Sequence, residues 1–188
     1  MAKEIEAKMK VDDLDIIRQR LKAAGARADG AALEINSFFD TPQAALRASG
    51  KGLRIRIATK DDGARKCTIT MKGPSEKGEL KTREEIEFAI TDPAEAQLLF
   101  ENLGYELTLS FEKRRESWNF QDCKIELDNL PYLGTFVEIE AGSDSLVMQA
   151  REALGLAQTP LIQTGYIAML ASYLTAHNIR ERRIRLQQ

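Results

Sequence analysis

The most constraining feature of the sequence is a strict alternation of apolar and charged side chains near its start. In "KEIEAKMK", residues 3–10, positions 5, 7 and 9 hold Ile5, Ala7 and Met9, and the even positions hold Glu4, Glu6, Lys8 and Lys10. An alternation of period two is typical of a β-strand with one apolar and one polar face. The polar face here carries strong acids and strong bases together, which needs an explanation.

The same alternation recurs in later segments that the sequence predicts to be strands. Their charged phase holds Arg54 and Arg56 in "GLRIRIA", Lys72 in "KCTITMK", Arg83, Glu85 and Glu87 in "REEIEF", Lys113 and Arg115 in "FEKRRESW", Glu126 and Asp128 in "KIELD", and Glu138 and Glu140 in "FVEIE". A charged solvent face is the ordinary explanation for any single antiparallel strand. Here the polar face is almost purely ionic in strand after strand, and acids and bases are segregated between strands. This pattern favours a binding surface.

If these faces close into a barrel, its interior holds arrays of Arg and Lys beside clusters of carboxylates. Burying so much charge without compensation would be costly, so such an interior must be wet and must hold charged ligands. Guanidinium and ammonium groups bind phosphate oxygens. Paired carboxylates without a histidine or thiolate ligand favour a hard ion, Mg²⁺ or Mn²⁺. The pattern therefore predicts a polyanion and a divalent cation in one site.

Turn and cap residues divide the chain into strands and helices without a linker. Helices are expected at residues 12–25, 92–104, 144–155 and 160–182, with Asp12 or Asp13 and Asp92 as N-caps. Strands are expected at residues 3–10, 33–39, 52–59, 65–72, 82–90, 106–120, 123–128 and 135–141. We therefore expect a single α+β domain over residues 1–188, with a mainly antiparallel sheet or barrel and a C-terminal helical segment at about 144–182.

Composition argues against several classes of protein. The 188 residues are 43% apolar and 30% charged, which is typical of a globular chain. The net charge of −2 gives no general attraction to nucleic acid or membranes. The single histidine, His177, argues against His-ligated zinc and against Ser-His or Cys-His nucleophiles. The basic stretch at residues 180–188 is better explained as a solvated helix end than as an RNA-binding segment.

Cysteine usage and hydropathy bear on location. Cys67 and Cys123 lie in the apolar phase of predicted strands, so we expect buried free thiols and a reducing cytoplasm. No apolar run approaches the length of a membrane span, and no signal peptide precedes Lys3. We therefore expect neither a membrane nor a nucleic acid as a partner, and a homodimer stays open.

The motifs in these strands resemble, in content and in order, those of the CYTH superfamily, also called triphosphate tunnel metalloenzymes. They are "EIEAK", which fits E-x-E-x-K in full, then "LRIR", "TMKGP", "REEIE", "FEKRR" and "ELDNLPYLGTFVEIE", and with the C-terminal helix they span roughly residues 3–170. The resemblance implies an eight-stranded antiparallel β-barrel that forms a tunnel, with flanking helices. The residues of the last two motifs are most similar to those of the class IV adenylyl cyclase branch.

The resemblance also implies roles for the charged residues. It implies Mg²⁺ or Mn²⁺ on Glu4, Glu6, Glu138 and Glu140, and a triphosphate on Lys8, Arg54, Arg56, Lys72, Lys113 and Arg115, with Arg83 joining these contacts. Glu85, Glu87, Glu126 and Asp128 match acidic positions that orient the bases or hold a second metal, so Glu126 and Asp128 are further candidate metal ligands. The expected catalytic residues are Glu4, Glu6, Lys8, Lys72 and Glu85.

The resemblance leaves more than one function open. The family includes enzymes that hydrolyse inorganic or organic triphosphates, and class IV adenylyl cyclases, which convert ATP to cyclic AMP and pyrophosphate. Hydrolysis makes fewer demands on the site, because it does not need a pocket for a nucleotide base, and no such pocket is visible in the sequence. We therefore expect a metal-dependent triphosphatase, with cyclisation as the alternative. A polyphosphate-binding module without turnover is disfavoured, because anion binding alone would not need so many inward acids.

One stretch departs from the family pattern. Many members carry a basic residue and a serine before a tyrosine in the C-terminal helix, whereas this chain has Thr164 and Gly165 before Tyr166. One expected phosphate contact therefore lacks its counterpart, and thiamine triphosphatase becomes a less favoured activity. The only tryptophan, Trp118, has the phase opposite to Arg115, so we expect it in the core and not stacked on a base.

Overall fold

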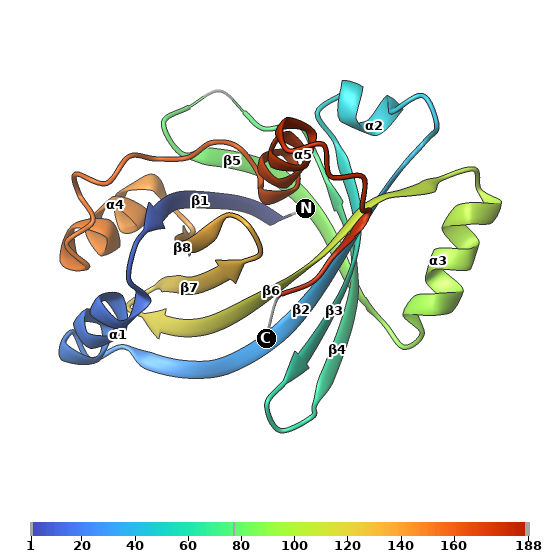
Figure 1. Cartoon of the computed structure of the whole chain (residues 1–188). Helices are drawn as coiled ribbons and strands as arrows, with labels where there is room; N and C mark the ends of the chain where they lie inside the picture. Colours follow the sequence, from blue (N-terminus) through green and yellow to red (C-terminus); the bar gives the residue numbers. More distant parts are fainter. Residues whose placement is uncertain (1, 77, 187–188) are drawn as a thin grey trace.

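The structure is a computed structural model that describes residues 2–76 and 78–186, and the backbone but not the side chains of residues 2–4. Within these residues eight strands form a closed barrel (Figure 1): β1 Ala2–Val11, β2 Arg27–Asp40, β3 Gly52–Lys60, β4 Arg65–Lys72, β5 Lys81–Ile90, β6 Glu106–Phe120, β7 Cys123–Leu130 and β8 Gly134–Ala141. The strand order is β2-β3-β4-β5-β1-β8-β7-β6, and pairing between β2 and β6 closes the ring. All eight pairings are antiparallel. The predicted α+β, eight-stranded antiparallel barrel with flanking helices is confirmed.

Five helices in the described residues flank the barrel: α1 Leu14–Ala23, α2 Ala45–Ala48, α3 Pro93–Asn102, α4 Asp144–Ala153 and α5 Tyr166–Ala176. The predicted caps are confirmed, since Asp13 caps α1 and Asp92 caps α3 with Pro93 in the first turn. The short helix α2 was not predicted. It depends on the buried carboxylate of Asp40, which accepts hydrogen bonds from the backbone N–H groups of Leu46 and Arg47.

The prediction of one helix over residues 160–182 was wrong at both ends. Before α5 the chain is extended, because Leu161 forms a β-bridge with Met9 and the N–H of Ile162 donates to the carbonyl of Lys8. After α5 the chain turns at Asn178, which has a φ of 56°. The chain then forms β9 (Arg183–Ile184), which pairs in parallel with β6.

The main apolar core lies outside the barrel wall and not within it. The outward side chains of β1, β7 and β8 are almost fully buried, and they pack against apolar residues of α1 and α4: Ala7, Met9, Ile125, Leu127, Val137 and Ile139 on the strands, and Ile17, Leu21, Val147 and Ala150 on the helices. Trp118 and Cys123 belong to the same cluster, and Cys67 is also a buried free thiol, as predicted. The charged phase of the strands therefore points inward.

Helix α5 covers one end of the barrel. Its Tyr166, Leu170 and Leu174 form a cluster with Phe111 and Phe136. Those two strand residues have the same phase as the inward Lys113 and Glu138, so α5 packs on side chains that face the interior. The interior is thus closed by apolar contacts at this end. In the described part of the chain, no helix is long and apolar enough to cross a membrane.

Two neighbouring residues of β8 test whether the apolar core lies outside the barrel wall and the charged side chains lie inside it, because their side chains point to opposite faces of the strand. Ile139→Ala should lower the free energy of unfolding by about 2–5 kcal/mol, since Ile139 is fully buried under the helices. Glu140→Gln should leave the free energy of unfolding unchanged or raise it, because burial raises the pKa of this carboxyl and so disfavours its charged form in the folded protein. Urea denaturation of both variants measures the difference, and equal losses would contradict it.

Candidate active site inside the barrel

All eight strands direct charged or polar side chains into the barrel. The lining of one cavity of about 270 Å³ includes Glu6 and Lys8 from β1, Asn36 from β2, Arg54 and Arg56 from β3, Lys72 from β4, Lys81, Arg83, Glu85 and Glu87 from β5, Lys113 and Arg115 from β6, Lys124 from β7, Glu138 and Glu140 from β8, and Tyr166 from α5. A second cavity of about 280 Å³ shares Arg56, Glu87, Arg115 and Lys124 with the first. The barrel interior is therefore a charged tunnel with two cavities that share part of their lining.

Three carboxylates form a compact acidic corner. One oxygen each of Glu6, Glu138 and Glu140 lies within 4.8 Å of the others. Strand register explains this, because Glu6 pairs with Glu140 and Lys8 pairs with Glu138 across the β1–β8 ladder. A set of carboxylate oxygens suits a hard divalent cation. The side chain of Glu4, which the sequence also assigned to the metal, lies outside the described residues.

The two carboxylates of β8 have pKa values shifted in opposite directions. Burial alone would raise the pKa of Glu138, but the charges of Lys8 and Arg115 outweigh it and hold this pKa well below its usual range. Burial raises the pKa of Glu140, and the neighbouring charge of Glu138 adds to the rise although Arg115 opposes it. A divalent cation would compensate the excess negative charge at Glu140 that the nearby cations leave.

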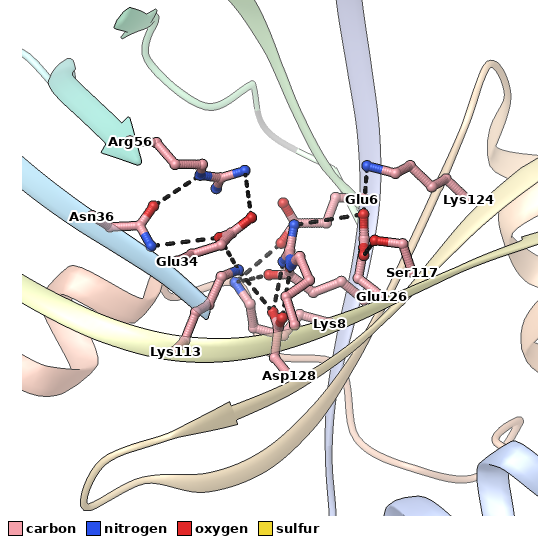
Figure 2. Close-up of polar contacts among 12 residues, drawn as sticks. Glu6, Lys8, Glu34, Asn36, Arg56, Lys113, Ser117, Lys124, Glu126 and Asp128 are labelled. Carbon is pink, nitrogen blue, oxygen red and sulfur yellow. Dashed lines mark hydrogen bonds and ion pairs between the residues drawn. The ribbon is translucent and has the colours of Figure 1, made fainter. Parts of the chain in front are cut away.

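The other two predicted metal ligands pair with cations of the tunnel (Figure 2). Asp128 accepts two hydrogen bonds from Arg115, Nε to Oδ1 at 2.7 Å and Nη2 to Oδ2 at 2.6 Å, and one from Lys113 Nζ at 3.0 Å. Glu126 pairs with Lys124 and accepts a hydrogen bond of 2.6 Å from Ser117. Both carboxylates therefore orient cations in this structure, and a metal-binding role for them stays a prediction.

The basic side chains are held in place but only partly neutralised. Arg54 donates to Thr70 at 2.9 Å and lies 3.5 Å from Glu87, while Arg56 lies 3.3 Å from Glu34. Burial, followed by the charge of Arg56, lowers the pKa of Arg54 to about 9. Burial and the adjacent Arg115 likewise lower the pKa of Lys113. A lowered pKa means that the folded protein disfavours the cation, and a bound anion would relieve that cost.

The remaining candidates gather on β4 and β5. Lys72 forms an ion pair with Glu85, and Arg83 donates to the same carboxylate oxygen at 2.8 Å. Glu85 therefore holds two cations together at the wall of the first cavity. Glu6 and Lys8 lie on β1, the strand that pairs with β5. The Lys8 ammonium is 3.0 Å from both Glu6 and Glu138. With Glu4 set aside, every predicted cation and the expected catalytic residues thus line the first cavity.

Sequence reasoning missed several residues of the site. Glu34 lies 3.4 Å from Lys113 and 3.3 Å from Arg56, and Asn36 accepts a hydrogen bond of 2.9 Å from Arg56. Both alternate with Leu33 and Ile35, and this pattern could have identified them. Further lining residues that were not among the predicted site residues are Lys81, Lys124, Ser117 and Tyr166. Lys81 precedes the predicted strand by one residue but has the phase of Arg83.

A closed barrel with a charged interior defines a class of tunnel proteins, and comparison with known proteins identifies the family. The family model described as CYTH domain matches residues 2–162. A protein of Methanocaldococcus jannaschii named "Putative adenylate cyclase" is 27% identical over 175 residues, which cover 88% of this chain and 97% of that protein. "Adenylate cyclase CyaB" of Aeromonas hydrophila is 29% identical over 188 residues, covering 93% of this chain and 92% of that protein.

Solved structures show the same fold. The PH1819 protein of Pyrococcus horikoshii superposes with a TM-score of 0.79 at 24% identity, covering 90% of this chain and 99% of that one. A Hippeastrum protein, described as a "Putative adenylyl cyclase" that reveals a dominant triphosphatase activity, has a TM-score of 0.69 at 21% identity, covering 92% and 96%. This chain belongs to the CYTH domain family, whose members act on triphosphates.

Glu34→Gln tests whether Glu34 neutralises the cations of the tunnel, in contrast to the carboxylates that are assigned to a metal. Burial alone would raise the pKa of Glu34, but Lys113, Arg56 and Arg115 outweigh it and lower this pKa far below its ordinary 4.5. Such a carboxylate contributes stability that is present above pH 4.5 and is lost as the pH falls below it. The variant should therefore unfold more easily at pH 7 and show a shallower loss of stability between pH 4.5 and 3.

The same variant should respond more strongly to a polyanion, because Glu34 no longer competes for Lys113 and Arg56. We expect tripolyphosphate to raise its melting temperature by more than it raises that of the wild type. Glu84→Gln, an exposed position on the outer face of β5, is the matched control and should behave like the wild type. The role of Glu34 would be contradicted if all three proteins lost the same stability between pH 4.5 and 3 and showed the same rise in melting temperature with tripolyphosphate.

Proposed function

We propose that this protein is a divalent-metal-dependent enzyme that binds a triphosphate in the tunnel and hydrolyses it. One observation carries the proposal: the acidic corner of Glu6, Glu138 and Glu140 faces the same cavity as buried cations with lowered pKa values. The cavity lining carries more basic side chains than carboxylates, and three of its carboxylates lie together in the acidic corner. A chain of phosphates would pair with the basic side chains, and a divalent cation bound to that chain would be held by the acidic corner.

The residues of the chain divide the work of phosphoryl transfer. This chemistry needs charge neutralisation and in-line positioning more than covalent help. Arg54, Arg56, Lys113 and Arg115 would hold phosphate oxygens, and the forked guanidinium groups would fix their orientation. Glu6, Glu138 and Glu140 would hold Mg²⁺ or Mn²⁺, which supplies Lewis-acid neutralisation of phosphate charge when bound. Lys72 and Arg83, held by Glu85, would contact the part of the triphosphate that lies along β4 and β5.

Cyclisation is the second candidate, favoured by the name of the Aeromonas hydrophila relative. The tunnel residues that hold the triphosphate are the same for both reactions, and they differ in which group attacks. Hydrolysis requires only that water reach a phosphorus atom, whereas cyclisation also requires that the ribose 3′-hydroxyl be placed against the α-phosphorus. The activity described for the Hippeastrum protein is consistent with hydrolysis in a barrel of this fold. We therefore favour hydrolysis.

The setting of the enzyme follows from the same features. We propose that residues 1–188 act as one domain in a reducing compartment such as the cytoplasm, because both cysteines are buried free thiols. The triphosphate is the expected partner. A homodimer and the absence of nucleic-acid binding stay predictions.

A substrate panel tests the proposed reaction. ATP, GTP, thiamine triphosphate and tripolyphosphate would each be incubated with Mg²⁺ and with Mn²⁺, and phosphate, pyrophosphate and cyclic nucleotide would be measured separately. We expect phosphate release that stops when the metal is chelated. Cyclic AMP with an equal amount of pyrophosphate would instead establish the cyclase. Binding without any product would reduce the protein to a polyphosphate-binding module.

Removal of one carboxylate tests the metal assignment. Glu6→Gln should abolish turnover and weaken Mn²⁺ binding, because one of three oxygen ligands loses its charge while the fold is retained. Turnover at limiting metal and Mn²⁺ binding by electron paramagnetic resonance would be measured beside the exposed Glu84→Gln control. Full activity of Glu6→Gln at limiting metal would show that the ion binds elsewhere.

Removal of one guanidinium tests the triphosphate assignment. Arg54→Ala should raise KM and slow the chemical step by roughly a hundredfold, the order expected when one preorganised donor is lost. Arg54→Lys should rescue the rate only in part, because the forked geometry is lost. Arg47→Ala, at an exposed position of α2 that lines neither cavity, serves as the control. Steady-state kinetics equal to wild type in Arg54→Ala would place this side chain outside the substrate contacts.

A further inference from the structure

Tyr166 is a buried tyrosine whose hydroxyl has no use in the fold. Its exposed fraction is 8%, and its Oη has no hydrogen-bond partner among the described residues. Leaving a buried hydroxyl unpaired costs roughly 1–3 kcal/mol. Phenylalanine would fill the same space against Phe136 without that cost, since the two rings pack edge to face with centroids 5.2 Å apart. Packing alone therefore does not explain a tyrosine here.

The ring of Tyr166 lies against two cations of the tunnel. The ammonium of Lys8 is 4.2 Å from the ring centroid, and that of Lys113 is 5.3 Å from it. Both ammonium groups thus contact the face of the ring, not the hydroxyl. The same two ammonium groups form ion pairs with Glu138 and Asp128, at the centre of the charged network. The ring therefore limits where these cations can lie in the cavity.

Tyr166 is the first residue of α5, at the point where this helix meets the tunnel. Gly165, Tyr166 and Ile167 all line the first cavity beside the cations. Gly165 is the N-cap of α5 and offers no side-chain cap, so the first N–H groups of this eleven-residue helix add partial positive charge at the cavity wall. Burial, with the charges of Asp128 and Glu138, raises the pKa of Tyr166 well above its ordinary value, which keeps the phenol protonated as a donor.

We propose that Tyr166 is a substrate-binding and positioning residue of the tunnel: its hydroxyl donates to an anionic oxygen of the bound triphosphate, and its ring holds Lys8 and Lys113 toward that ligand. This inference rests on the proposed function, since it requires a phosphate-bearing ligand in the cavity. It adds a neutral donor on α5 to a site otherwise built from barrel strands. It also gives the end of the tunnel that α5 closes a direct contact with the substrate.

Two variants separate the hydroxyl from the ring. Tyr166→Phe keeps the ring and its contacts with the ammonium groups, and Tyr166→Leu removes both ring and hydroxyl. Tyr173→Phe is the matched control, because Tyr173 lies on the same helix but stacks on Tyr132 and His177. Binding of tripolyphosphate would be measured by calorimetry without metal, the melting temperature without ligand, and kcat and KM with Mg²⁺.

Tyr166→Phe should weaken tripolyphosphate binding about tenfold or more, as expected for a lost hydrogen bond to a charged group. Its melting temperature without ligand should be equal to or above that of the wild type, because the unpaired buried hydroxyl is gone. A merely structural role would instead lower the melting temperature and leave binding unchanged. Tyr166→Leu should lose a further few-fold in affinity and also lower kcat, since Lys8 and Lys113 are no longer held.

The outcomes distinguish this inference from the proposed function. Wild-type protein that binds tripolyphosphate, with equal affinity in Tyr166→Phe, would overturn the inference and leave the proposed function intact. Equal weakening in the Tyr173→Phe control would also overturn it, because the effect would then belong to α5 as a whole. Wild-type protein that neither binds nor hydrolyses tripolyphosphate or the nucleotides would overturn both.

Discussion

The burial of charge inside the barrel is the constraint on which the rest of the structure depends. A continuous chain of ion pairs crosses the interior from β1 to β3, and its members are Glu6, Lys8, Glu138, Arg115, Asp128, Lys113, Glu34 and Arg56. Every link joins an acid and a base from different strands or from alternate positions of one strand. Because desolvation offsets most of the Coulomb attraction in such pairs, this chain fixes geometry more than it stabilises the fold.

Stability must therefore come from the other face of the same strands. Met9, Ile125, Val137 and Ile139 are fully buried beneath α1 and α4, so each strand of this region is covered on both sides. The alternation of period two makes this division possible, since one strand supplies an ionic wall and an apolar surface at once. The helices are thus required by the site: without α1 and α4 the barrel would expose the apolar surface of β1, β7 and β8 in order to keep its charges inside.

The sequence predicted which side chains of a strand point into the barrel, but it did not predict how neighbouring strands align. The alternation identified the inward Arg54, Arg56, Lys113 and Arg115, because the side-chain phase of a strand depends on local sequence alone. Which acid meets which base depends on how strands align, and the sequence does not carry that directly. The sequence therefore left open whether Asp128 and Glu126 orient bases or hold a second metal, and the β6–β7 ladder places Asp128 opposite Arg115, where it is a partner of cations. Glu34 was overlooked because it is the only charged residue in the inward phase of the predicted strand at residues 33–39, where Asn36 and Phe38 follow it. The C-terminal helix was overextended because residues 161 and 162 are held by β1, a long-range contact without a local signal.

The placement of charge around the ring also bears on which ligands fit. The acidic corner is on β1 and β8, whereas Arg54 and Arg56 are on β3, and β4 and β5 lie between them along the sheet. Neighbouring strands are about 4.8 Å apart, so these two regions face each other across the barrel and do not touch. A single phosphate would reach one region only. The proposed ligand, a chain of phosphates that carries a divalent cation, would reach both, and it would stabilise the charged forms of Arg54 and Lys113, whose pKa values are lowered in the folded protein. The strand order is in this way consistent with a ligand longer than a single phosphate.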